Sequence, residues 1–152
     1  MATSVTRDPM LRHGRVRWLG DPPQGVARVY VDSDAFTALP LSSPNGEPHE
    51  GESTPGELLA AAYSAFMATD LAERLELNGV PARELVVHAW CRMSAGGTPR
   101  SVVGVEVKVF GRVPGVDEER FRSVTGVALA SCHRSLGMRR ALRTKLQVSL
   151  EH

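Results

Sequence analysis

Cys132 is the residue of this sequence best suited to nucleophilic chemistry. His133 and Arg134 follow it directly, and nearby positive charge lowers the pKa of a thiol so that the reactive thiolate can form. Such a thiolate attacks peroxides and other electrophiles. Apolar residues at helical spacing lead from Phe121 to Cys132, however, and a cysteine on the apolar stripe of a helix commonly serves as a small core side chain. The core interpretation is favoured, and the nucleophile interpretation stays open.

The other groups that could do acid, base or thiol chemistry have simpler interpretations. Glu57 lies three residues after Thr54, the spacing of a capping box, so capping of a helix is favoured over a catalytic carboxylate. Cys91 occupies an inward position on an expected strand. Together with Cys132 it forms neither a disulfide framework nor a metal-binding motif.

Metal and phosphate sites are not expected. Gly96 and Gly97 lie between two expected strands, where glycines form a turn, whereas a phosphate-binding loop would connect a strand to a helix. The histidines are dispersed, without an i, i+4 pair or a cysteine partner at metal-binding spacing: His13, His49, His88 and His133. We therefore predict no metal, no nucleotide motif and no cofactor.

A long helix must position several of these groups. Thr54 and Glu57 mark its start, and Gly79 supplies a left-handed stop. From 58 to 69 no residue is charged, and apolar or small side chains occupy every face of the helix. Such a helix is expected to be buried on all sides. One small sheet cannot cover it, so packing favours a dimer.

Alternating apolar residues predict strands before and after this helix. Two hairpins are expected, the second with Val103 and the alternate valines after it facing inward. Asp117 begins a second helix, and the residues from 40 to 53 have the composition of a loop. The order ββαββαβ predicts an α+β fold with mainly antiparallel pairing. The expected strands span 14–19, 26–32, 85–93, 102–109 and 145–150.

Length and charge limit the possible functions. A chain of 152 residues fits one domain, expected here over 13–149, after a flexible arm at 1–12 and before a purification-tag remnant at 150–152. With 18 basic and 17 acidic residues there is no excess charge to attract nucleic acid. No uncharged apolar run reaches the length of a membrane span and no signal peptide is evident, so a soluble, cytoplasmic protein is predicted.

Five segments, by their order and spacing, resemble the OsmC/Ohr family of oxidative stress response proteins. They are His13 to Asp21, Thr54 with Pro55, Leu58 to Tyr63, Val113 to Asp117, and Cys132 with Ser135. The resemblance covers nearly the whole chain and implies an OsmC-like fold, with antiparallel sheets around two long central helices in an intertwined homodimer. It also implies a peroxiredoxin-like chemistry. Typical members reduce organic hydroperoxides with a peroxidatic cysteine in the central helix and a resolving cysteine in the second helix, assisted by a glutamate and an arginine.

Position by position, this sequence departs from the family pattern. Cys132 matches the resolving cysteine, but Phe66 stands at the peroxidatic position. Gly56 stands where the glutamate belongs, with Glu57 one place beyond, and His133 replaces the proline that usually follows the second cysteine. A benzyl side chain cannot attack a peroxide, so these linked departures indicate a lost or changed activity.

Which residue would supply the arginine that the resemblance implies is also open. The loop from 41 to 52 contains no arginine, which leaves Arg15, Arg17 and Arg28 on the early strands as possible suppliers. Arg28 and Tyr63 therefore complete the set of residues expected near the cleft that the resemblance implies.

The leading hypothesis is a divergent OsmC-like homodimer, without ordinary two-cysteine peroxidase activity, that binds an apolar small molecule or does altered chemistry in the interface cleft. One alternative is a one-cysteine, thiol-dependent reductase of organic hydroperoxides in which Cys132 acts alone. Another is a structural or regulatory protein without a pocket. Open space beside Phe66 and Cys132 favours binding or catalysis, and a filled core favours the structural alternative.

Overall fold

The computed structural model describes residues 11–21, 26–42, 50–94, 101–138 and 142–152. Its chain divides into two compact units, Met1–Pro55 and Gly56–His152. The single domain expected over 13–149 and the tag remnant at 150–152 stay predictions, and most of the expected arm at 1–12 lies outside the described residues. Residues 150 and 151 end the last strand of the second unit.

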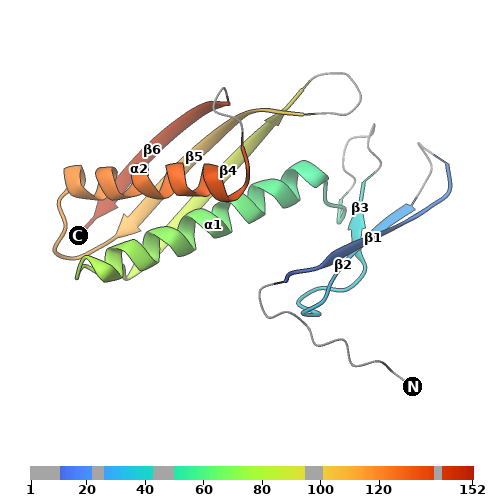
Figure 1. Ribbon diagram of the computed structural model, residues 1–152, viewed down its shortest axis with the longest axis horizontal. Helices are drawn as coiled ribbons and strands as arrows, with labels where there is room; N and C mark the ends of the chain where they lie inside the picture. Colours follow the sequence, from blue (N-terminus) through green and yellow to red (C-terminus); the bar gives the residue numbers. More distant parts are fainter. Residues whose placement is uncertain (1–10, 22–25, 43–49, 95–100, 139–141) are drawn as a thin grey trace. The chain divides into compact units, whose positions relative to one another are not determined.

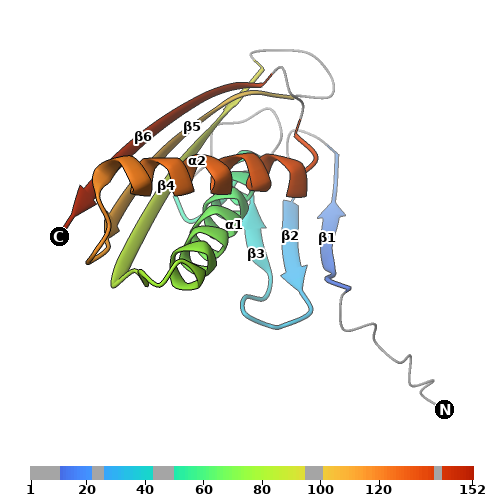
Figure 2. The same cartoon turned by 60° about the vertical axis from the view of Figure 1, so that its left-hand side comes forward.

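The first unit contains a sheet of three antiparallel strands in the order β1-β2-β3 (Figure 2). The predicted hairpin of β1 (Gly14–Leu19) and β2 (Val26–Val31) is confirmed. The third strand, β3 (Leu39–Leu41), was not predicted, because its part of the sequence has loop composition and contains Pro40. Proline is tolerated in an edge strand, since its missing N–H leaves only one ladder bond unmade.

Helix α1 (Pro55–Leu77), which lies in the second unit from Gly56 onward, confirms the predicted long helix. Gly79, with φ of 75°, follows its end in the left-handed region that glycine adopts without strain. Side chains at intervals of four residues are buried: Tyr63, Met67, Leu71 and Leu75. Burial on every face is not reached within one chain, in line with the expectation that one small sheet cannot cover this helix. The sheet covers one side of α1 and leaves Phe66 47% exposed on another.

A second sheet has the order β4-β5-β6, with β4 (Glu84–Met93) antiparallel to β5 (Val102–Arg112) as predicted. Its register shifts near the end of β4, where Arg92 faces Gly104 and Met93 faces Val102. Val103 is thus the extra residue of a β-bulge. This corrects the expectation that Val103 points inward, since the bulge leaves its side chain 44% exposed.

The last strand, β6 (Arg143–Glu151), is longer than predicted and pairs parallel to β5. Pairing is thus mainly antiparallel, as predicted, and β6 is the parallel exception among the described strands. A parallel neighbour requires a crossover connection, which α2 (Glu118–Ser135) supplies here. Its N-cap is Asp117, as predicted, whose carboxylate accepts from the Arg120 amide at 2.7 Å.

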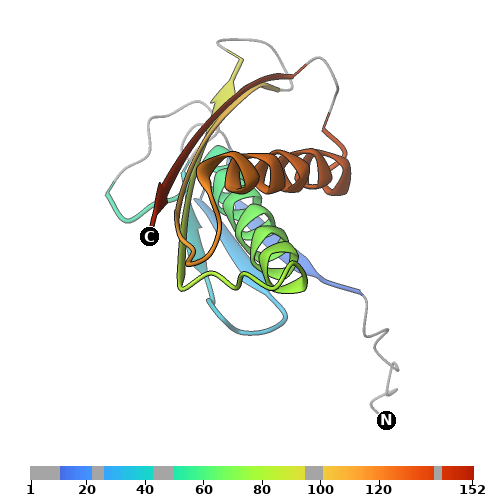
Figure 3. The ribbon, with the colours of Figure 1, turned by 90° about the vertical axis from the view of Figure 1, so that its left-hand side faces the viewer.

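Both helices lie on the same face of the β4-β5-β6 sheet, which curves around them (Figures 1 and 3). The predicted apolar stripe of α2 is confirmed, because Phe121, Ala128 and Cys132 are buried with the inward valines of β5. None of the described helices is long and apolar enough to cross a membrane. Because both helices lie on one face of the β4-β5-β6 sheet, the opposite side of the α1–α2 pair is not covered by that sheet.

Candidate functional site

A cleft of about 190 Å³ opens between α1 and α2. Phe66 and Cys132, which the sequence singled out, both line it. Five polar or acidic side chains complete the lining: Thr69, Asp70, Glu73, Ser131 and Ser135. The cleft therefore combines an exposed benzyl group and a thiol with hydroxyl and carboxylate groups.

Cys132 is held in the wall of this cleft as a neutral thiol. The residue is only 2% exposed, and its Sγ donates to the backbone oxygen of Tyr63 at 3.7 Å. Burial, together with the negative charge of Asp70, raises the pKa of Cys132 to about 11, and the nearby Tyr63 side chain only partly opposes this rise. At neutral pH about one thiol in ten thousand would be ionised, which disfavours nucleophilic attack.

The rings of Tyr63 and His133 contact each other, with centroids 5.6 Å apart in an edge-to-face arrangement. Neither the Tyr63 hydroxyl nor His133 Nε2 has a hydrogen-bond partner among the described residues, although both atoms are buried. Burial raises the pKa of Tyr63 and lowers that of His133, so both side chains are neutral near pH 7. His133 therefore supplies no positive charge to activate Cys132.

The charges lining the cleft are acidic. Asp70 is paired with Arg74 on the same helix, with 2.6 Å between Oδ2 and Nε. Among the described residues, none that lines the cleft is a lysine or arginine. A peroxide-cleaving site stabilises its thiolate and its leaving oxygen with a cation, so this cleft is unsuited to that chemistry.

The remaining predicted site residues lie elsewhere. Gly56 and Glu57 belong to the first turn of α1, ten and nine residues before Phe66, which places them roughly 15 Å away along the helix axis. Arg28 lies on β2 in the first unit, where its guanidinium donates to the Ala27 oxygen at 3.3 Å. Within the second unit, the structure therefore brings together Phe66 and Cys132, but neither Gly56 nor Glu57 reaches the cleft.

Sequence reasoning missed the acidic lining of the cleft. Asp70 follows Phe66 by four residues and Glu73 follows it by seven, so both belong to the same face of α1. This spacing was available in the sequence. Their effect on a facing thiol depends on the position of α2 beside α1, which the spacing within α1 does not contain.

Two further features lie outside this cleft. Cys91 is half-buried on the inner face of β4, and burial raises its pKa. The described residues contain no group of three or more His, Cys, Asp or Glu side chains that could hold a metal ion. A larger depression, of about 690 Å³, lies on the β4-β5-β6 sheet, lined in part by Trp90, Glu106 and Lys145.

Comparisons with known proteins identify the fold. Neither a scan against protein-family models nor a search of curated proteins finds a match. Among solved structures, an organic hydroperoxide resistance protein from Elizabethkingia anophelis is similar, with a TM-score of 0.69 and 22% identity over 94% of this chain and 99% of that one. An OsmC-like protein from Mycoplasma pneumoniae has a TM-score of 0.69 and 13% identity, over 92% and 98%.

A third similar structure is the organic hydroperoxide resistance protein OsmC from Legionella pneumophila, with a TM-score of 0.64 and 18% identity over 90% of this chain and 96% of that one. The agreement spans nearly the full length of each chain. It shows that this chain has the α+β, OsmC-like fold, as the resemblance in sequence predicted.

Proposed function

We propose that this protein is an OsmC-like homodimer that binds an apolar small molecule in the cleft between α1 and α2 and lacks two-cysteine peroxidase activity. One observation carries the proposal. Phe66 is 47% exposed in the lining of a cleft whose Cys132 is a buried thiol with its pKa raised to about 11. An aromatic wall and an unreactive sulfur suit the binding of an apolar group better than the cleavage of a peroxide.

Exposed apolar side chains on both units support the homodimer. Phe66 and Val127 on the helices are 47% and 48% exposed, and Val16 and Leu19 on β1 are each 54% exposed. A second copy of the chain, which the OsmC-like fold implies, is the partner proposed to cover this exposed apolar surface. A cytoplasmic location remains a prediction of the sequence.

The space beside Phe66 favours binding over a purely structural role. A cleft of about 190 Å³ in one chain holds only part of a drug-sized ligand, since such sites commonly enclose about 300 to 1,000 Å³. A second subunit laid against the helices would add its own wall and enclose the ligand. The ligand is expected to be neutral or cationic, because Asp70 and Glu73 disfavour an anion.

The alternative is a one-cysteine peroxide reductase, which the position of Cys132 in the lining of an open cleft favours. In that reaction the thiolate attacks one peroxide oxygen and the O–O bond breaks. An alcohol leaves and a sulfenic acid forms, which two equivalents of an external thiol then reduce with release of water. The raised pKa of Cys132 opposes the first step.

Fluorescence of N-phenyl-1-naphthylamine, a neutral apolar probe, tests the proposal. We expect saturable enhancement with the native protein and a loss of about tenfold or more in affinity in Phe66→Ser. The matched control, Val86→Ser, removes an exposed apolar side chain from β4 and should bind the probe normally. Sedimentation of the same samples separates loss of the cleft from loss of the dimer.

Equal probe binding by Phe66→Ser and the native protein would contradict the binding site. Rapid turnover of an organic hydroperoxide that is abolished by Cys132→Ser would instead establish the one-cysteine alternative.

A further inference from the structure

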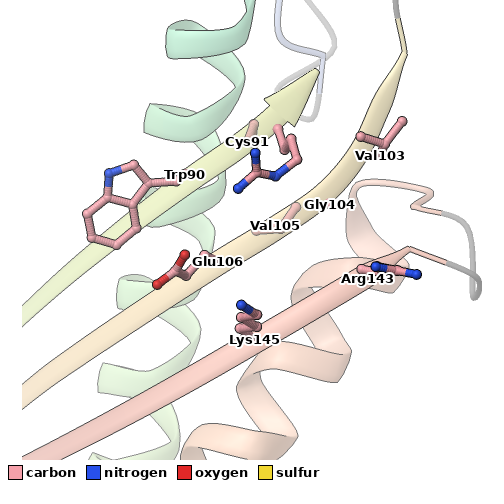
Figure 4. A pocket seen from close by; sticks show the side chains of 9 residues that line it. Trp90, Cys91, Val103, Gly104, Val105, Glu106, Arg143 and Lys145 are labelled. Atoms are coloured by element: carbon pink, nitrogen blue, oxygen red, sulfur yellow. The ribbon is translucent and has the colours of Figure 1, made fainter. Parts of the chain in front are cut away.

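The outer face of the β4-β5-β6 sheet, which points away from the two helices, carries a second group of side chains. The strand register places Trp90, Glu106 and Lys145 in one row across the three strands. The next row toward the bulge contains Arg92, Gly104 and Arg143. These six residues, which we call the outer-face site, line the depression of about 690 Å³ (Figure 4).

The cations of this site are available to a ligand. At the opposite end of the same face, Arg112 lies between two carboxylates, 3.4 Å from Glu84 and 3.1 Å from Glu151. Within the described part of the chain, no ion pair involves Arg92, Arg143 or Lys145. Glu106 is the carboxylate that shares the site with them. Three cations and one carboxylate therefore line the depression, and this excess of positive charge makes that end of the face attractive to an anion.

Trp90 provides a planar apolar surface beside these charges. It is 48% exposed, and His88 stacks on it with ring centroids 5.6 Å apart and planes inclined by 15°. Lys108 lies 5.5 Å from the indole centroid. His88 and Lys108 face each other in the neighbouring row of the sheet, on the side of Trp90 that is away from Gly104. They hold the ring in place, while no described ring or cation of the Gly104 row stacks on it.

Gly104 and the bulge create the open space between these groups. A Cβ at Gly104 would lie 3.4 Å from the Arg143 backbone oxygen and 3.8 Å from Arg92 Cβ. Because Gly104 has no side chain, the space between the long cationic side chains of Arg92 and Arg143 is not filled from β5. The extra residue Val103 also twists β5 here, and bulges commonly redirect side chains next to functional sites.

We propose that the outer-face site binds a small anionic ligand with a planar nitrogen-containing ring, of the nucleoside monophosphate class. The ring stacks on Trp90, and its N–H groups donate to the Glu106 carboxylate. The phosphate lies among Arg92, Arg143 and Lys145. This recognition uses a sheet face and needs no glycine-rich phosphate loop, which the sequence lacks.

The carboxylate of Glu106 favours some classes of ligand over others. An anion without a ring would be repelled by Glu106 and would gain nothing from Trp90. An apolar ligand would leave three cations without partners. A ligand that joins ring N–H donors to a phosphate satisfies all three kinds of group at once, and guanosine 5′-monophosphate is the probe with this combination.

Proton–nitrogen NMR of the full chain tests the site, with the indole N–H of Trp18 as an internal control for that of Trp90. We expect guanosine 5′-monophosphate to shift the Trp90 signal saturably at millimolar concentration or below, and to leave Trp18 unmoved. Guanosine and ribose 5-phosphate should each bind about tenfold more weakly or worse, because each lacks one half of the recognised ligand.

Variants locate the contacts. Lys145→Ala should weaken binding about tenfold by removing one charge-assisted contact. Gln147→Ala, on the same face of β6 but outside the site, should bind as the native protein does. Native amide spectra of both variants show that they fold.

Three outcomes would overturn the proposal. The first is the absence of a saturable Trp90 shift at roughly 10 mM probe. The second is equal binding of ribose 5-phosphate, which would leave only a phosphate site. The third is much tighter binding of a single-stranded oligonucleotide, which would make this face a nucleic-acid surface.

Discussion

The behaviour of Cys132 follows from two neighbours, the apolar core around it and the carboxylate of Asp70. Both raise the pKa of the thiol to about 11, above the roughly 8.5 of an unperturbed cysteine. The thiolate is therefore scarce below pH 9 and becomes abundant only as pH rises through about 11. A catalytic cysteine requires the opposite shift.

Alkylation by iodoacetamide measures this effect. We expect Cys132 to react slowly at pH 7, with the rate rising close to tenfold per pH unit up to about pH 10. Asp70→Asn should accelerate the reaction severalfold, because it removes the nearby negative charge. Glu73→Gln is the matched control, since Glu73 also lines the cleft but does not contribute to the shift.

Rapid alkylation of Cys132 near pH 6, ahead of Cys91, would contradict the raised pKa and would support the one-cysteine reductase. Equal acceleration by Asp70→Asn and Glu73→Gln would show that general negative charge, rather than the specific position of Asp70, controls the thiol.

The burial of Cys132 was predictable, whereas the exposure of Phe66 was not. Helical spacing from Phe121 fixes which face of α2 carries the thiol. Phe66 lies in a helix that is apolar all round, so periodicity does not select the side that the sheet covers. That choice depends on tertiary packing, which a local pattern does not contain.

At the scale of helices and strands, local signals predicted the caps and both hairpins. The Asp117 cap and the turn after α1 depend on residues near in sequence, and each is present. The parallel pairing of β6 with β5 joins residues about 40 positions apart and depends on the crossover through α2. The bulge at Val103 likewise depends on how two strands end, so alternation alone did not reveal it.

Gly111 and Gly126 form a test of the packing of α2 against β5. A Cβ at Gly111 would collide with the Phe121 ring, whereas a Cβ at Gly126 would meet no atom within 4 Å. We expect Gly111→Ala to lower the free energy of unfolding by about 1 to 3 kcal/mol through overpacking. Gly126→Ala should raise it by about 0.5 to 1 kcal/mol, because alanine is the better helix former.

Urea unfolding followed by circular dichroism measures both changes. If Gly111→Ala were neutral, Phe121 would have room to move and the close approach of α2 to β5 would be wrong. A destabilising Gly126→Ala would show that this face of α2 is covered, as it would be in a tight dimer interface.

For the whole molecule, the exposed apolar side chains of the helices are the basis of the proposed homodimer. Phe66→Glu places a charge at the centre of the proposed interface, so we expect the dimer dissociation constant to rise about 100-fold or more. Val86→Glu, on the sheet face away from the helices, should leave the dimer intact. Sedimentation velocity over a range of concentrations distinguishes the two. A native protein that sediments as a folded monomer at micromolar concentration would refute the homodimer.

The proposed loss of peroxidase activity also concerns the whole molecule, because the chemistry that the family resemblance implies needs a sulfur, a carboxylate and an arginine together. We expect native turnover of organic hydroperoxides with a dithiol reductant to be near background, and Phe66→Cys alone to restore little. A sulfur at position 66 would meet Cys132 in the cleft, but the residues lining that cleft offer acids and no cation to stabilise its thiolate.

Adding Gly56→Glu supplies the carboxylate that holds the arginine in family members. It should therefore raise turnover more in the Phe66→Cys background than in the native one, and the two changes should be non-additive. Gly56→Glu alone should do nothing, because no attacking sulfur is present. Coupled steady-state assays of the four proteins measure this interaction. Native turnover comparable to that of a two-cysteine enzyme, abolished by Cys132→Ser, would show that a sulfur at position 66 was never needed and that the apolar cleft is a working active site.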